Sequence, residues 1–585
     1  MSSETTLRGP ATRAAQSAPG RVRRPGELLA LSGLVLLALI LFATPLGLLA
    51  KVGLTLDGLP SLAPFLEALD SRSVRRAAWN SFESSAVSAV AALAVGTALA
   101  LAIGLTDVRL KGQLVFLLLL PMMIPPQVTA IAWVQALGPG SPVLNWVGLA
   151  PPPGSAHPLY TPFGVMLLLT IQHAPLVFLV VLAALRSLPR EMSDAARISG
   201  AGPVRLLRRV ILPLIAPALV AGAMLAFVSA LGNFGIQAIL GIPARYTTLP
   251  VLIWRRLSSF GPSVLTDVAV ISLVLATVAI LALILQNLMQ RRMRAAVTGP
   301  PQPPLRIALG PWRPAAEGAL GLYVAATLIL PVAALMATAL VRTYGLPLTA
   351  ETLTMENFAE ILFRQGATLR AFANSTLTAG AAALALAALS ILIGYYHARS
   401  RGAGRRVGGA MAGLADVSYA IPGLVISIAF ILAFIRPLPL IGLSLYNTLG
   451  IIFLAYLTAF LSIALKPVAA AYGNLDGALD DAARVSGAGF GKRMARIFAP
   501  LVAPAAASGA ILVFLTAYNE VTVSALLWSA GNETIGTAIF NYEDGGYTTL
   551  AAAMSAVTVV ATVVLMAALD RAGRHLPAGV VPWRS

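Results

Sequence analysis

One stretch of the chain occurs twice and decides the fold. It reads DAARISGAGPVRLLRRVILPLIAP at residues 194–217 and DAARVSGAGFGKRMARIFAPLVAP at residues 481–504. The two copies align without a gap, 287 residues apart. A match of this length is not expected by chance even in a biased sequence. We therefore interpret the chain as a duplication of one unit.

Two shorter pairs of residues support the duplication. Asn80-Ser81 and Asn374-Ser375 stand at the start of the second apolar run of each half. Ile124-Pro125 and Ile421-Pro422 stand inside the third run of each half. Because the pairs occur in the same order, the two halves are predicted to have the same succession of helices.

The composition excludes most classes of soluble protein. A chain of 585 residues could hold several soluble domains, but 58% of its residues are apolar and only 11% are charged, against about 25% charged residues in ordinary globular chains. The chain has no cysteine, which excludes disulfides, zinc fingers, iron–sulfur clusters and a cysteine nucleophile. Its four histidines are scattered, so no metal site is expected.

The apolar residues gather in runs that are long enough to cross a bilayer, which takes about 20 residues per helix. We predict an all-α membrane protein with about twelve transmembrane helices in two pseudo-symmetric six-helix halves. The spans of the first half are predicted at 27–50, 79–105, 112–136, 161–185, 211–239 and 264–287. Those of the second half are predicted at 317–341, 374–396, 408–435, 446–470, 500–527 and 548–569.

The positive charge agrees with one orientation in the membrane. Most of the 41 Lys and Arg residues fall on cytoplasmic segments if the amino terminus lies inside, as the positive-inside rule requires. The charge therefore indicates topology rather than nucleic-acid binding. We predict a multi-pass protein of the bacterial inner (plasma) membrane with both termini in the cytoplasm. Its predicted divisions are a disordered tail 1–25, a first half 26–295, a proline-rich cytoplasmic linker 296–315, a second half 316–570 and a tail 571–585.

The repeated stretch predicts a short helix on a fixed turn. The Asp-Ala-Ala-Arg segments carry a carboxylate that is expected in the first helical turn, where the helix dipole favours it. Gly-Ala-Gly at 200–202 and 487–489 then ends the helix, because glycine readily adopts positive φ. A second basic helix leads into the next span. One such loop could simply be a solvated cytoplasmic segment, whereas two matching copies favour a docking element for a two-fold partner.

This pattern resembles the EAA loop of the membrane subunits of bacterial ABC importers: an acidic residue, two alanines, three residues, glycine, nine residues and Ile-x-Leu-Pro. The matching positions are Asp194, Ala195, Ala196, Gly200 and Pro213 in the first copy, and Asp481, Ala482, Ala483, Gly487 and Pro500 in the second. Asp replaces Glu in both copies, and Ala499 replaces Leu in the second. A permease with both halves fused is similar to the ferric-iron importer permeases, with thiamine and aminoethylphosphonate permeases as relatives.

The resemblance implies partners rather than chemistry in this chain. In that family the short helix is a coupling helix, so two copies of an ATPase subunit are expected on the cytoplasmic side, with a periplasmic solute-binding protein and membrane lipid. No catalytic residue, metal or cofactor is expected here, since ATP and Mg²⁺ would bind the ATPase. Gly487-Ala-Gly-Phe-Gly-Lys492 lacks the glycine spacing and the Ser/Thr of a phosphate-binding loop. Ferric iron is the favoured solute, with thiamine, aminoethylphosphonate or a polyamine as alternatives.

Polar residues inside the spans are candidates for the solute pathway, because an ionisable group at bilayer depth costs free energy and usually has a function. Glu520 lies in span eleven, and Asn233 occupies the matching place in span five. Both are expected at the interface between the halves, unless they serve only as hydrogen-bonding groups. Asp416, Gln172 and His173 are further candidates, each with a packing or capping role as the alternative.

Two other classes of protein are open to test. A secondary transporter also has twelve spans and repeats, but it would need ion-coupling charges in both halves, where only Glu520 and Asp416 qualify. A membrane-embedded enzyme would need paired carboxylates, a histidine cluster or a Ser/Lys dyad, and none of these is found at helical spacing. Co-purification with an ATPase would separate the importer from the secondary transporter.

Overall fold

The computed structural model of the chain describes residues 25–575, apart from 153, 189, 262, 293–306, 438–441 and 443, and also Val580. The predicted tail 1–25 and most of the predicted linker 296–315 lie outside the described residues, as does much of the tail 571–585. Within these residues the structure is all-α apart from one short hairpin, in which Thr55 pairs with Pro60 and Leu56 with Leu59.

The elements of the first half follow each other as predicted for a six-helix unit. They are α1 (Pro25–Ala38), η1 (Leu39–Ala43), α2 (Thr44–Gly53), β1 (Thr55–Leu56), β2 (Leu59–Pro60), α3 (Ala63–Asp70), α4 (Arg72–Leu105), α5 (Lys111–Met123), α6 (Pro126–Leu137), α7 (Pro142–Trp146), α8 (Pro162–Arg186), α9 (Arg190–Ile198), α10 (Pro203–Leu206), η2 (Leu207–Ile211), α11 (Leu212–Leu231), α12 (Gly235–Gly241), α13 (Leu249–Leu257) and α14 (Val264–Arg292). The η segments are single irregular turns that join helices.

The second half repeats this order without a hairpin among its described residues. Its elements are η3 (Gly310–Trp312), α15 (Arg313–Val324), η4 (Ala325–Ile329), α16 (Leu330–Ala339), α17 (Glu356–Ala359), η5 (Glu360–Arg364), α18 (Gly366–Ala398), α19 (Ala403–Ala420), α20 (Gly423–Phe434), α21 (Leu449–Asn474), α22 (Ala478–Val485), α23 (Phe490–Arg493), η6 (Met494–Phe498), α24 (Ala499–Tyr518), α25 (Ser524–Leu527), α26 (Ile535–Asp544) and α27 (Thr548–Ala572).

Within the described residues, ten helical segments are long and apolar enough to cross a membrane, and two bent helix pairs bring the number to 12 if each pair counts as one span. The spans predicted at 112–136 and 408–435 are each a bent pair of helices. The chain bends there by 99° between α5 and α6 and by 114° between α19 and α20. The bends fall at Ile124 and Ile421, whose extended backbone is what a following proline imposes.

Spans five and eleven also end earlier than predicted. In the first half α11 stops at Leu231 and α12 begins at Gly235, and in the second half α24 stops at Tyr518 and α25 begins at Ser524. An apolar composition continues across both breaks, so hydropathy alone cannot place them. Both breaks carry a polar residue that the sequence singled out, Asn233 in the first half and Glu520 in the second.

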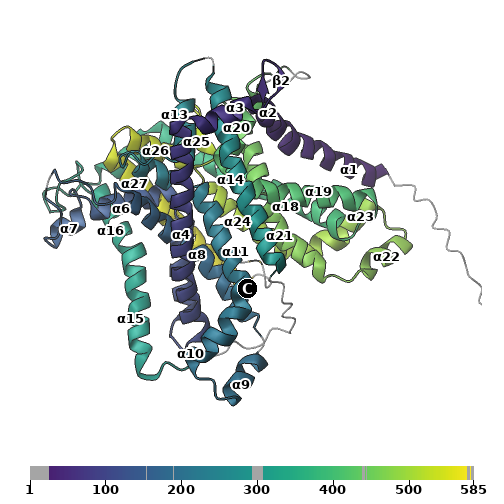
Figure 1. The fold of residues 1–585 in the computed structure, drawn as a ribbon, viewed down its shortest axis with the longest axis horizontal. Coiled ribbons are helices and arrows are strands. Elements are labelled where there is room, and N and C mark those ends of the chain that lie inside the picture. The colour runs from purple at the N-terminus through teal and green to yellow at the C-terminus, as the bar shows by residue number, and fades with distance from the viewer. Residues whose placement is uncertain are drawn as a thin grey trace, which may run out of the picture.

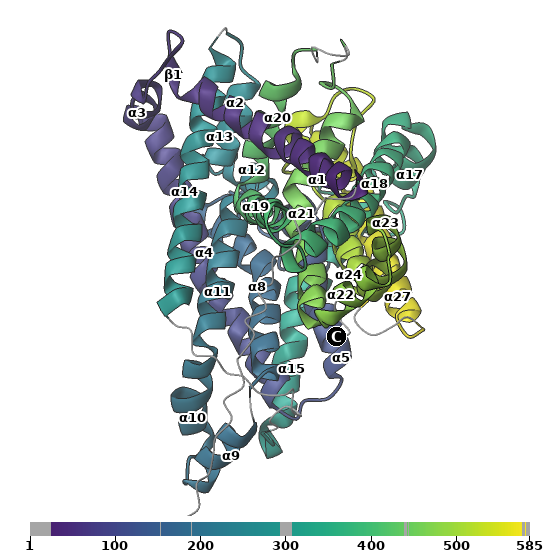
Figure 2. The same ribbon diagram turned by 90° about the vertical axis from the view of Figure 1, so that its right-hand side faces the viewer.

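Each half is built on one packed trio of long helices. In the first half α4, α8 and α11 pack together, and in the second half α18, α21 and α24 do so. The first segment of each half crosses over to the other half: α1 and α2 lie against α19 and α20, and α16 packs on α6. Figure 2 shows α1 and α2 running across the second half in this way. The exchange ties the halves together around a continuous apolar core.

The two copies of the repeated stretch lie at the ends of these trios. In Figure 1, α9 and α10 lie at the foot of the first half, and α22 and α23 lie at the right-hand end of the second half. The hairpin and α3 lie at the top of the same view, away from both copies.

Candidate functional site

The first copy of the repeat forms an elbow that we define as α9, the turn at 199–202 and α10. The hydroxyl of Ser199 donates to the carbonyl oxygen of Ala195 at 2.9 Å, and the N–H of Ala201 donates to the carbonyl oxygen of Ala196 at 3.0 Å. Gly200 has φ +79°, a left-handed conformation that only glycine adopts without strain. The predicted helix-ending glycine is thus confirmed.

The second copy forms an elbow of the same geometry, comprising α22, the turn at 486–489 and α23. The hydroxyl of Ser486 donates to the carbonyl oxygen of Ala482 at 2.9 Å, and the N–H of Ala488 donates to the carbonyl oxygen of Ala483 at 3.0 Å. Gly487 has φ +76°. Every one of these contacts has its partner 287 residues earlier in the first elbow, so the two turns are the same structure.

One detail of the predicted helix is wrong in the first elbow. The helix α9 begins at Arg190, so its first turn holds Glu191 and Asp194 lies one turn further on. In the second elbow α22 begins at Ala478 and its first turn does hold Asp481. The motif aspartates therefore do not share one position relative to the helix start, although they share one position relative to the glycine turn.

Both elbows present an apolar face outside the packed core. The side chain of Ile198 is 88% exposed and its counterpart Val485 is 90% exposed. Met192 and its counterpart Leu479 are also exposed. Four large apolar side chains at matched places on two short helices are costly to leave in water, and exposed apolar surface of this kind is typical of an interaction site.

The elbows differ in how they are fastened to the bundle. Asp480 of the second elbow is buried and pairs with Arg493 at 2.7 Å and with Arg484 at 2.8 Å. The Tyr395 hydroxyl, from α18, donates to the same carboxylate at 3.3 Å and accepts from Arg484 at 3.1 Å. The Arg493 side chain is only 4% exposed. We call these four residues the anchor cluster.

The anchor cluster is packed between aromatic rings. Phe490 lies 5.7 Å from Tyr395 and 5.9 Å from Tyr396, measured between ring centroids, and Phe498 lies 5.1 Å from Tyr395. Burial among rings weakens solvent screening, so the ion pairs hold more firmly than they would at a surface. The ion pairs therefore hold α22 against α23, and the hydrogen bonds of Tyr395 tie the second elbow to α18.

The first elbow is fastened by apolar contacts at the corresponding places. Leu206 stands where the second elbow has Arg493, and Ile211 stands where it has Phe498; both are buried. Ser193 replaces Asp480 in the sequence. The sequence reasoning chose Asp481 and missed Asp480, although a second aspartate four residues before an arginine, absent from the other copy, was a usable signal.

Glu520 and Asn233 occupy matched places in the two breaks. The Glu520 carboxylate accepts the N–H groups of Val523 and, at 3.1 Å, of Ser524 at the start of α25. The Asn233 side-chain oxygen accepts the N–H of Ile236 at 3.1 Å at the start of α12. Both residues thus cap a short helix. This is the hydrogen-bonding role that the sequence left open as the alternative to a place in the pathway. A role in the pathway stays a prediction.

The other pathway candidates have local partners as well. Asp416 is exposed, accepts a hydrogen bond from Ser462 at 2.9 Å and pairs with Lys466 at 3.8 Å. His173 is buried with its Nδ1 at 2.7 Å from the carbonyl oxygen of Leu169 in its own helix. Gln172 is buried and donates to the carbonyl oxygen of Ile124 at 3.3 Å. Only Gln172 of these three reaches one of the helix breaks.

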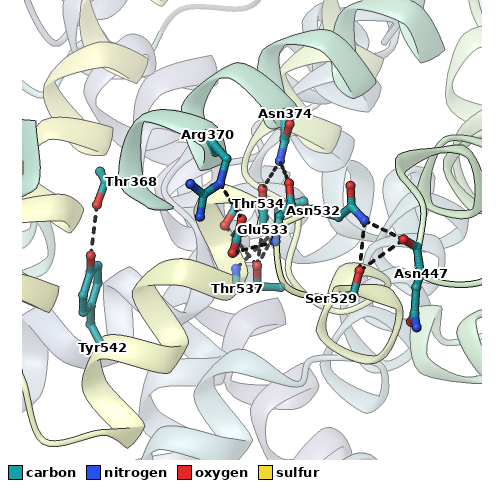
Figure 3. Close-up of polar contacts among 11 residues, drawn as sticks. Thr368, Arg370, Asn374, Asn447, Ser529, Asn532, Glu533, Thr534, Thr537 and Tyr542 are labelled. Carbon is teal, nitrogen blue, oxygen red and sulfur yellow. Dashed lines mark hydrogen bonds and ion pairs between the residues drawn. The ribbon is translucent and has the colours of Figure 1, made fainter. Parts of the chain in front are cut away.

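The repeated Asn-Ser pairs prove to be matched anchors at the other end of the long helices. In the second half Asn374 donates to the carbonyl oxygen of Glu533 at 3.0 Å, and Ser375 accepts the N–H of Ile535 at 2.9 Å. Figure 3 shows Asn374 reaching this loop beside Arg370 and Glu533. In the first half Asn80 and Ser81 make the same contacts with Thr247 and Leu249. The pairs hold the starts of α26 and α13.

The described end of the linker binds the first half. The N–H of Ile307 donates to the carbonyl oxygen of Leu105 at 2.6 Å, and the N–H of Leu309 donates to Asp107 at 3.0 Å. The Leu309 hydrogen bond holds the pKa of Asp107 below its ordinary value.

Within the residues that the structure describes, no three His, Asp or Glu side chains gather as metal ligands.

Comparison with known proteins agrees with the doubled architecture. The family described as "Binding-protein-dependent transport system inner membrane component" matches twice, at residues 92–295 and 390–580. A probable ABC transporter permease protein, y4fN, of Sinorhizobium fredii is 27% identical over 84% of this chain and 86% of its own length. A probable molybdenum ABC transporter permease of Haloferax volcanii is 31% identical over 44% of this chain and 88% of its own length.

Two further likenesses span different shares of the chain. A putative ferric transport system permease protein, FbpB 1, of Haemophilus influenzae is 24% identical over 75% of this chain and 68% of its own length. A crystal structure of a bacterial ABC transporter that imports alginate aligns with a TM-score of 0.39 and 21% identity, over 46% of this chain and 96% of that chain. Because the family pattern covers both halves, the chain belongs to the inner-membrane permease family of binding-protein-dependent ABC transporters.

Proposed function

We propose that this permease forms the passage of an ATP-driven importer, with one ATPase subunit docked on each elbow and a periplasmic binding protein delivering a small solute. The observation that carries the proposal is the matched pair of exposed apolar faces, Met192 with Ile198 and Leu479 with Val485. Each face is presented on a helix that a positive-φ glycine holds at a fixed angle. Two equal faces suit two copies of one partner.

The proposed cycle uses the elbows as levers. Nucleotide binding draws the two ATPase subunits together, and each subunit moves the elbow on which it is docked. The first elbow passes this motion to α11 and the second passes it to α24, because each elbow runs directly into that helix. The halves then alternate between an opening to the cytoplasm and an opening to the periplasm. This orientation places both termini in the cytoplasm of a bacterial inner-membrane protein.

Ferric iron is the first solute to test. The ferric permease of Haemophilus influenzae resembles this chain over 75% of its residues, so the likeness extends through both halves. Thiamine, aminoethylphosphonate and a polyamine follow as the alternatives that the fused architecture suggested. Molybdate and sulfate are further candidate solutes, because relatives named as molybdenum and sulfate permeases match 44% and 24% of this chain.

The proposal is tested by straining the two turns. Valine at Gly200 and Gly487 must adopt positive φ, which costs of order 1–3 kcal/mol per site, so the elbows should lose their shape. We expect the Gly200→Val, Gly487→Val double variant to reach the membrane in normal amount, to lose the co-purifying ATPase and to lose ATP-dependent uptake into vesicles.

A matched pair of substitutions controls for bulk. Gly202 and Gly491 lie in the same elbows, and a Cβ at either site would meet no atom within 4 Å; Gly202 also has an ordinary φ of −67°. The Gly202→Val, Gly491→Val variant should retain the ATPase and uptake. Normal uptake by the Gly200/Gly487 variant would refute the docking role of the elbows.

A further inference from the structure

The two halves meet where the breaks in their helices meet. Asn519, at the end of α24, donates to the carbonyl oxygen of Met123 at the end of α5, across 396 positions of sequence. On the other side of the pseudo-two-fold axis, a Cβ on Gly232 would lie 3.4 Å from Pro422. Each α11 or α24 end therefore rests on the bent helix pair of the opposite half. The centre of the molecule is built from these four breaks.

Three carboxamide side chains at this centre are buried and incompletely paired. Gln127 is 0% exposed, Gln172 is 5% exposed and Asn519 is 7% exposed. Among the described residues, these leave without a hydrogen-bond partner both polar atoms of Gln127, Oε1 of Gln172 and Oδ1 of Asn519. A buried polar group that lacks a partner costs free energy. The arrangement in this structure is therefore unfavourable for the three carboxamide side chains.

The three side chains all belong to or bind one stretch of backbone, residues 123–127. Gln172 donates to the carbonyl oxygen of Ile124 at 3.3 Å, and Asn519 donates to that of the preceding residue, Met123, at 3.0 Å. Gln127 follows three residues after Ile124. A Cβ built on Gly536 would lie 2.7 Å from the carbonyl oxygen of Glu520 and 3.2 Å from Nε2 of Gln127, so residues of both halves lie against this stretch.

The orientation of two of these amides is fixed by their neighbours. The nitrogen atoms of Gln172 and Asn519 face backbone carbonyl oxygens, so an exchange of oxygen and nitrogen would set two acceptors against each other. Their free atoms are therefore oxygens. With Oε1 of Gln127, the set offers three unpaired acceptors against one unpaired donor.

The positions related to these three by the pseudo-two-fold axis hold no such set. The match of Ile124-Pro125 with Ile421-Pro422 puts Leu424 opposite Gln127, and the match of the repeats puts Ala459 opposite Gln172 and Gly232 opposite Asn519. Packing a helix break does not require carboxamides, since the second break is packed without them. The polar set is thus a property of one side of the axis and calls for a role other than packing.

We propose that Gln127, Gln172 and Asn519 form a solute-contact site in the passage, which is closed in this structure and which accepts a cationic solute through carboxamide oxygens when the halves part. The proposal rests on the proposed function, because it needs the halves to separate. It also names the solute class, since unpaired carboxamide oxygens suit a cation and oppose an oxyanion.

Accessibility tests the place of the site. Because the chain has no cysteine, Gln127→Cys and Asn519→Cys each introduce a single thiol. With the ATPase and binding protein assembled, a sulfonated maleimide added from the periplasmic side should label both thiols after trapping with ATP and vanadate, and neither without nucleotide. Ser88→Cys, at a buried position of α4, should stay unlabelled throughout and serves as the control.

The result separates this inference from the proposed function. If no ATPase assembles with the chain, the proposed function fails. If the ATPase assembles and hydrolyses ATP while Gln127→Cys and Asn519→Cys stay unlabelled in both states, the contact site alone is overturned.

Two substitutions of Gln127 test the solute class. Gln127→Met removes the acceptor, whereas Gln127→Glu keeps acceptor oxygens and adds negative charge. With ferric iron as the cationic probe and molybdate as the oxyanionic probe in proteoliposomes, we expect iron uptake to fall about tenfold in Gln127→Met and to stay near the wild-type rate in Gln127→Glu. Uptake of molybdate, uptake of neither probe, or iron uptake that Gln127→Met leaves unchanged would each overturn the assignment.

Discussion

The two elbows share a backbone and differ in their fastening. Their turns superpose contact by contact, from the serine hydroxyl to the positive-φ glycine. The first elbow rests on Leu206 and Ile211, whereas the second rests on the anchor cluster around Asp480. The backbone is thus common to both copies of the duplicated unit, while the attachment to the bundle is not. The shape of the elbow and its attachment to the bundle can therefore be altered separately.

The largest expected effect follows from breaking the anchor cluster. Asp480→Ser installs the residue of the first elbow and leaves Arg493 buried without its carboxylate, and removal of one partner of a buried ion pair costs about 3–5 kcal/mol. We expect a lower thermal unfolding midpoint in detergent and a weaker hold on the ATPase. The first elbow should keep its share of ATPase binding, because its own packing is untouched.

A second substitution turns this loss into a test of the comparison. Asp480→Ser combined with Arg493→Leu copies both residues of the first elbow, Ser193 and Leu206. Since the buried charge is then gone, stability should recover most of the loss. A double variant as unstable as Asp480→Ser alone would mean that the anchor cluster and the apolar fastening are not interchangeable, contrary to this account.

A smaller effect is expected at His157, just before the start of α8, at the end of that helix away from the first elbow. His157 accepts the N–H of Leu159 at its Nδ1, 3.1 Å away, so its Nε2 donates to the carbonyl oxygen of Val134 at 2.9 Å. This pattern requires neutral imidazole. Burial lowers the pKa of His157 below its ordinary value of 6.5. The stabilisation is complete above the unfolded pKa and is lost as the pH falls through that value toward the folded one.

The measurement compares the wild type with His157→Phe, which keeps a ring beside Tyr160, whose own ring lies 4.4 Å from that of His157. Between about pH 8 and about pH 5, the unfolding midpoint of the wild type should fall by more than that of the variant. An equal fall in both proteins would assign the acid sensitivity to other groups.

Much of this architecture could be predicted from sequence because it is local or repeated. Gly200 and Gly487 were recognised as helix ends from the residue type alone, and the pairing of Asn233 with Glu520 followed from the repeat. The size of the bends at Ile124 and Ile421 could not be predicted, since a proline fixes the break but the tertiary packing fixes the angle. The burial of Asp480 could not be predicted because Tyr395, which covers it, lies 85 residues away in the sequence.

The role of a polar residue was harder to predict than its place. Glu520 and Asn233 were expected to face the passage, and their observed contacts are helix caps. Gln127, which the sequence did not single out, stands out only once its burial and its unpaired atoms are known. Hydropathy marks a polar residue in an apolar span, but it does not tell whether a backbone N–H lies nearby to satisfy it.

The most direct measurement uses the absence of cysteine in the natural chain. Ile198→Cys and Val485→Cys place single thiols on the two exposed apolar faces, and a short bifunctional maleimide reagent then reports what covers them in the assembled transporter. The account predicts a cross-link to the ATPase subunit from each thiol alone, and two ATPase subunits per chain when both are present. An assembled, ATP-hydrolysing complex in which neither thiol cross-links to the ATPase would contradict it.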